Sequence, residues 1–62
     1  MEHLDGLVEH IEAGGEVIFE RTHVGWWNAI WDDQSSRMRR MTRVSDQMAR
    51  ALIALQAAKR GG

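Results

Sequence analysis

The stretch EVIFERTHVGWWNAIW, residues 16–31, decides the fold of this 62-residue chain. Its first part, residues 16–22, is rich in β-branched and aromatic residues with period-two character, and residues 26–31 show the same character around three tryptophans. This pattern is typical of β-strands, and the three residues between the two segments, which end in glycine, are typical of a turn. The stretch therefore predicts an antiparallel β-hairpin with strands at about 16–22 and 26–31.

A helix is predicted ahead of the hairpin, at about residues 2–13. Four apolar residues recur there at the i, i+3, i+4, i+7 spacing that lines one face of a helix: Leu4, Leu7, Val8 and Ile11. Acidic residues occupy the opposite side. The glycine pair at 14–15 is a typical helix end, because glycine adopts the left-handed conformation without a Cβ clash.

The segment after the hairpin allows two interpretations. In the first, residues 37–43 form a third strand and Ser45 caps a separate helix at about 45–60. In the second, one helix begins near Ser35 and runs to Arg60, because methionines and leucines keep a heptad-like spacing there without glycine or proline. We favour the strand, since an isolated hairpin is marginal in water and a third strand would stabilise it.

The predicted fold class is α+β. It consists of an N-terminal helix, an antiparallel β-hairpin or three-stranded sheet, and a C-terminal helix whose Met48, Leu52 and Leu55 face the core. The whole chain, 1–62, is expected to form a single domain. A domain of this length buries only roughly 60% of its unfolded surface, and the chain has no cysteine for disulfides, so self-association into a homo-oligomer is expected to support it.

Charge is unevenly distributed, although the formal net charge is only −1. Residues 1–33 contain eight acidic side chains and one arginine, whereas residues 34–62 contain seven basic side chains and one acidic one. The two halves should attract each other, within one fold or between subunits. The nearly neutral total disfavours double-stranded DNA as a partner, because duplex binding depends on many phosphate contacts.

The residue content also narrows the chemistry. His23 is the only histidine near a hydroxyl, and no third group is placed to orient it, so the sequence predicts that the protein is not an enzyme. His3 and His10 lie seven residues apart without a recognised metal-binding pattern, so neither a metal nor a cofactor is expected. No apolar run approaches the roughly 18 residues of a membrane span, and the lack of cysteine suits a cytoplasmic location, the host cytoplasm if the protein is viral.

Three tryptophans within six residues, followed by a run of arginines, are the distinctive feature of the sequence. Tryptophan offers a large stacking face and arginine a bidentate fork, a combination that suits nucleotides and protein interfaces. Strand alternation places Trp27 and Trp31 on one face, where they can equally fill the core, and Trp26 on the other, where it is the better surface candidate. The candidate partner- or ligand-binding residues are Trp26, Trp27, Trp31, Arg37, Arg39, Arg40 and Arg43.

Three runs resemble parts of HicB-like antitoxin domains: EVIFER (16–21), GWWNAI (25–30) and SDQMARAL (45–52). They are similar to the strand, the Gly-aromatic-x-Ala strand and the Ala-rich helix of that family. The resemblance covers about half of the chain. It departs at residues 32–44, which have neither the Pro-containing turn nor the Gly-rich strand of the family, and no site residue is transferred. In size, tryptophan content and lack of catalytic residues, the chain also resembles small bacteriophage accessory proteins, among them anti-CRISPR and other counter-defence inhibitors.

These observations predict a non-catalytic binding protein. The leading hypothesis is a homo-oligomeric phage-type accessory protein that binds and inhibits a host defence protein stoichiometrically, through the strand face of Trp26 and the segment 37–43. An alternative is a homo-oligomeric sponge that sequesters a cyclic nucleotide or another small anionic nucleotide signal. A further alternative is a HicB-like antitoxin module that neutralises a toxin. Neither a membrane nor double-stranded DNA is an expected partner.

Overall fold

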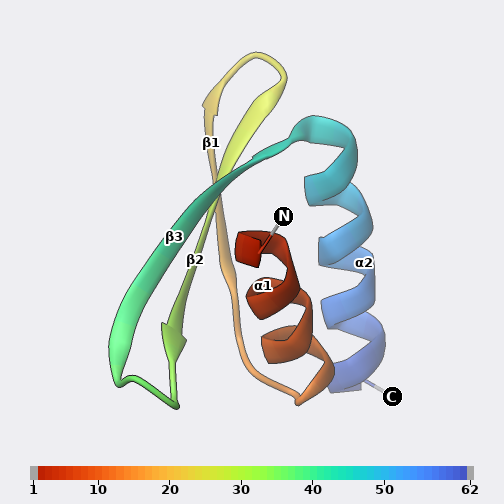
Figure 1. Cartoon of the computed structure of the whole chain (residues 1–62). Helices are drawn as coiled ribbons and strands as arrows, with labels where there is room; N and C mark the ends of the chain where they lie inside the picture. Colours follow the sequence, from red (N-terminus) through yellow and green to blue (C-terminus); the bar gives the residue numbers. More distant parts are fainter. Residues whose placement is uncertain (1, 62) are drawn as a thin grey trace.

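A computed structural model describes residues 2–61 of the chain, with side chains from residue 6 to residue 61. Its elements are α1 (Glu2–Glu12), β1 (Ile18–His23), β2 (Trp26–Asp33), β3 (Met38–Ser45) and α2 (Asp46–Gly61). The strands form one antiparallel sheet in the order β1-β2-β3, and both helices lie on the same side of it (Figure 1). The predicted α+β fold is therefore confirmed, in its three-stranded form. Within the described residues, no helix has both the length and the apolar character needed to cross a membrane.

Glycines shape the two connections that lead into and out of β1. At the end of α1, Gly14 has a φ of 88° and donates its N–H to the carbonyl oxygen of Ile11, 3.0 Å away. Gly15 donates to the carbonyl oxygen of His10 at 2.9 Å, which completes a Schellman helix end. At the β1–β2 turn, Gly25 has a φ of 87° and accepts a hydrogen bond from the backbone N–H of Asp46, 2.9 Å away. The hairpin is thereby attached to the first residue of α2.

The segment with two possible interpretations is a strand. All eight residues of β3 pair with β2. The continuous helix from Ser35 is therefore wrong, because the ladder with β2 takes up the backbone groups that such a helix would need. The helix α2 begins directly after β3, and the N–H of Met48 donates to Oγ of Ser45 at 3.1 Å. Ser45 is thus the N-cap that its position in the sequence predicts.

The core lies between the sheet and the two helices. Its buried side chains are Leu7, Ile11, Val17, Ala29, Trp31, Val44, Ala49 and Leu52, with Val8, Phe19, Trp27 and Leu55 packed partly against them. The side chain of Leu4, which was expected to join this core, lies outside the described residues.

One core prediction is wrong, because Met48 is 38% exposed and Ala49 is buried in its place. Ser45 is both the last residue of β3 and the N-cap of α2. Because no linker separates β3 from α2, the rotation of α2 about its own axis is fixed by the end of β3. In this orientation Ala49 points toward the sheet. A small residue at this point lets α2 approach the strands closely.

Arg37 lies in the β2–β3 turn with a φ of 58°, and its N–H donates to the carbonyl oxygen of Asp33 at 2.7 Å. A residue with a Cβ is strained in this left-handed conformation by roughly 1 kcal/mol, and glycine is not. We expect Arg37→Gly to raise the free energy of unfolding by about 0.5–1 kcal/mol in urea denaturation. Arg37→Ala is the control, since it removes the charge but keeps the Cβ. Equal stability of the two variants would contradict the strain.

Candidate functional site

The face of the sheet opposite the helices, hereafter the open face, has no other described element over it (Figure 1). Three large apolar side chains are exposed on it: Ile18 by 49%, Trp26 by 45% and Met41 by 63%. The complete open face, taken from the pairing of the strands and the alternation of side chains, consists of Ile18, Glu20, His23, Trp26, Asn28, Ile30, Asp32, Arg39, Met41, Arg43 and Ser45. Exposed apolar groups gathered on one face of so small a chain point to an interaction surface.

The register of the strands arranges the open face in rows. Ile18 pairs with Ile30, and Ile30 pairs with Met41, so an apolar row crosses all three strands. The neighbouring row begins with Glu20 on β1 and ends with Arg43 on β3. The open face therefore combines an apolar row with an acidic edge at Glu20 on β1 and a basic edge at Arg39 and Arg43 on β3.

Trp26 and Arg43 form a pair on the open face. The guanidinium carbon of Arg43 lies 6.0 Å from the centroid of the Trp26 ring, which is within the range of a cation–π interaction. The ring stays accessible beside this charge. Tryptophan and arginine are the residue types that contribute most often to the binding energy of protein interfaces.

The other two tryptophans are part of the fold. Trp31 is only 6% exposed and belongs to the core. Trp27 is half-buried, and its Nε1 donates to Oδ1 of Asp46 at 2.8 Å. This hydrogen bond and the Arg50 guanidinium, 3.0 Å from the other oxygen of Asp46, hold the pKa of that carboxyl below its ordinary value. Of the three predicted tryptophans, the structure leaves Trp26 alone on the open face.

The predicted arginines do not form one patch. Arg39 and Arg43 lie on the open face, Arg40 lies on the opposite side of β3, and Arg37 lies in the turn. Two of them bind acids of their own hairpin. Nε of Arg39 lies 3.3 Å from Oδ1 of Asp32, and Nε of Arg40 lies 2.7 Å from Oδ2 of Asp33. Arg43 is therefore the predicted arginine that is placed with Trp26.

Asp33 organises the β2–β3 turn. Its Oδ1 accepts hydrogen bonds from N–H and Oγ of Ser35, at 3.0 and 2.8 Å. These bonds and the one from Arg40 lower the pKa of Asp33 to about 2. Because this pKa is depressed in the folded state, the stabilisation is complete above the ordinary carboxyl pKa of about 4 and is lost as the pH falls toward 2.

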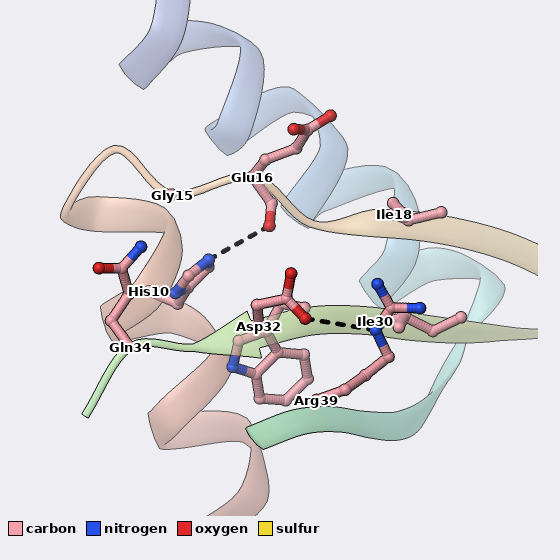
Figure 2. Close-up of a pocket in the computed structure, with 9 residues that line it drawn as sticks. His10, Gly15, Glu16, Ile18, Ile30, Asp32, Gln34 and Arg39 are labelled. Carbon is pink, nitrogen blue, oxygen red and sulfur yellow. Dashed lines mark hydrogen bonds and ion pairs between the residues drawn. The ribbon is translucent and has the colours of Figure 1, made fainter. Parts of the chain in front are cut away.

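Two shallow hollows adjoin the sheet. The smaller, about 250 Å³, lies between the end of α1 and β2. Figure 2 shows that its polar groups bind one another: Nε2 of His10 donates to the carbonyl oxygen of Glu16 at 3.2 Å, and Asp32 meets Arg39. The larger hollow, about 830 Å³, separates α1 from β3. Among the described residues, no three histidine or acidic side chains come close enough together to hold a metal ion.

Sequence reasoning missed Met41, the most exposed apolar residue of the three that define the open face. Its position could have been predicted from side-chain alternation once residues 37–43 were interpreted as a strand. Alternation then places Met41 on one face with Arg39 and Arg43, whereas the alternative helix would have separated them.

Comparisons of this chain with protein families, with characterised proteins and with solved structures gave no match. The resemblances drawn from the sequence therefore stay predictions. A function for this protein has to be argued from the open face itself.

Proposed function

We propose that this protein is a non-catalytic binder that docks its open face onto a protein of a host cell and inhibits it stoichiometrically, in the manner of a phage counter-defence inhibitor. The observation that supports this proposal is the open face. A chain with a thin core leaves Ile18, Trp26 and Met41 exposed together beside Arg43. Tryptophan, methionine and arginine are enriched at protein interfaces.

The shape of the site favours a protein over a small molecule. Ligand pockets are concave and bury most of the surface of the ligand. The open face is one side of a three-stranded sheet, and Arg39, which could bind a phosphate at one end of it, already pairs with Asp32. A broad partner surface fits this arrangement better than a nucleotide does.

One observation favours a second candidate function, the sequestration of a nucleotide signal. The Trp26 ring and the Arg43 guanidinium would provide a stacking surface and a positive charge side by side. Calorimetric titration with cyclic and linear nucleotides is the direct test. A heat of binding that the wild type shows and Trp26→Ala does not would support this function. No heat of binding with any of the nucleotides would count against it.

The inhibitor proposal is tested by comparing two double variants. The first, Trp26→Ala with Arg43→Ala, removes the aromatic and the cation from the open face. The second, Ile53→Ala with Arg60→Ala, removes one exposed apolar residue and one arginine from α2, on the other side of the sheet. The tagged variants are purified under mild conditions from bacterial lysate, and native mass spectrometry measures the masses of the complexes. The mass of a retained companion protein also shows whether the partner is a toxin.

We expect the wild type and the α2 variant to retain the same companion protein and the open-face variant to lose it. Titration with the purified companion should then show roughly 30-fold weaker binding for the open-face variant, since a hot spot contributes about 2 kcal/mol or more. Circular dichroism checks that both variants are folded. Unchanged binding by a folded open-face variant would contradict the proposal.

A further inference from the structure

The charges of the open face are polarised across the strands. Glu20 lies on β1 at one edge of the sheet, and Arg43 lies in the same row on β3 at the other edge. Asn28 lies between them, and the neighbouring row across the three strands is the apolar one of Ile18, Ile30 and Met41. A surface that complements this pattern must be basic opposite Glu20, acidic opposite Arg43 and apolar opposite the row of Ile18, Ile30 and Met41.

A second copy of the chain has this complementary pattern. When two such sheets are stacked face to face about a two-fold axis parallel to β2, β1 of each copy lies over β3 of the other. This rotation does not change the position of a residue along the strand direction. Glu20 therefore faces Arg43 of the second copy, and Ile18 faces its Met41. Sheets pack in this nearly aligned way about 10 Å apart. A two-fold interface also requires self-complementary surfaces of this kind.

The side chains of the central strand lie near that axis and meet their own counterparts. Trp26 would stack near Trp26, and Ile30 would pack on Ile30. Asn28 can donate to and accept from another Asn28. Asp32 is the like-charged group on the axis, and its carboxylate is bound by Arg39 of its own chain at 3.3 Å.

We propose that two copies of this protein pair through their open faces about this axis. The inference rests on the proposed function, since it names a second occupant for the same face. A host protein and a second copy would then compete for the open face, and the dimer keeps its apolar row covered until a partner is bound.

Two ways of pairing the edges of the sheet, β3 with β3 and β1 with β3, are less suited to self-association. Pairing β3 with β3 of another copy would bring Arg39, Arg40 and Arg43 beside the same residues of the second strand. Like charges on neighbouring strands are destabilising. Pairing β1 of one copy with β3 of another satisfies the charges but does not close, and would extend into a fibre. The face-to-face dimer satisfies the charges and closes.

The size of the open face sets the expected strength of the dimer. Three strands of six to eight residues measure about 15 Å by about 25 Å, or roughly 400 Å² on each copy. The total of roughly 800 Å² is below the 1,200 Å² or so that stable complexes bury, so a weak, reversible dimer is expected. Its dissociation constant should lie in the micromolar range, and a partner with a larger interface can displace one copy.

Sedimentation equilibrium of the full chain, from about 1 µM to about 1 mM, is the test. The mass should rise from the 7.1 kDa of one chain toward twice that value. Glu20→Arg and Arg43→Glu each place like charges opposite each other, so each alone should weaken the dimer by at least about tenfold. An equimolar mixture of the two variants restores opposite charges in both contacts. It should form a mixed dimer at least as well as the wild type.

The inference is supported if the mixture forms dimers again and circular dichroism shows that both variants are folded. A wild type that stays at 7.1 kDa throughout overturns it, and so does a dimer that neither charge reversal weakens. The proposed function is judged separately, by capture of a companion protein. A monomer that still captures its companion through Trp26 would overturn the dimer alone, whereas a charge-dependent dimer without a companion would contradict the inhibitor proposal alone.

Discussion

Replacing Trp31 with alanine is expected to remove about 3–5 kcal/mol from the free energy of unfolding, as large-to-small substitutions of buried aromatics do. Trp31 is 6% exposed and packs in the single described core beneath the helices. A domain of this length has a total stability of roughly 3–9 kcal/mol. The substitution therefore removes between about a third and all of it. In far-ultraviolet circular dichroism, Trp31→Ala should unfold at a much lower urea concentration than the wild type, or be unfolded without urea.

Trp26→Ala is the matched control, because it makes the same substitution on the other face of the same strand. Trp26 is 45% exposed and its described partner is the Arg43 guanidinium. Loss of an exposed cation–π pair should lower the free energy of unfolding by at most about 1 kcal/mol. Urea denaturation followed by circular dichroism measures both variants. Similar losses for Trp26→Ala and Trp31→Ala would show that the open face is buried in solution, or that Trp31 is not in the core.

The sequence predicted that these two tryptophans lie on opposite faces of the sheet, because strand alternation is a local property, but it left open whether Trp31 fills the core or binds a partner. Side chains of successive residues point to opposite faces, so Trp26 and Trp31 are separated whatever the rest of the chain does. The burial of Leu7 and Ile11 was predicted for the same reason, since the spacing within one helix fixes which residues share a face. Such predictions need no knowledge of long-range contacts.

Other features depend on how distant elements meet and could not be predicted. The position of α2 on the sheet decides that Ala49 rather than Met48 is buried, although both are apolar and adjacent in the sequence. The register of β3 against β2 decides that Met41 extends the apolar row. The placement of the arginines depends on the folded hairpin in the same way, because the β2–β3 turn contains Arg37 and ion pairs across the hairpin hold Arg39 and Arg40.

Gln56 illustrates the same limit most clearly, because no pattern in the sequence singled it out. It lies on α2, 39 residues from its partner, and makes two hydrogen bonds to the backbone of Val17. The N–H of Val17 donates to Oε1 of Gln56, and Nε2 of Gln56 donates to the carbonyl oxygen of Val17 at 3.2 Å. One amide side chain thus satisfies both polar groups of the residue that precedes β1, as a neighbouring strand would.

Gln56→Ala is expected to lower the free energy of unfolding by about 1–3 kcal/mol, because it leaves two partly buried backbone groups without their partner. Urea denaturation measures the loss, and hydrogen exchange should show faster exchange at the Val17 amide. Gln47→Ala, an exposed change of the same type on the same helix, should have little effect. Equal stability of the two variants would contradict the role of Gln56. Because Val17 is itself buried in the core, release of this backbone should also loosen the start of β1, and with it the acidic edge of the open face.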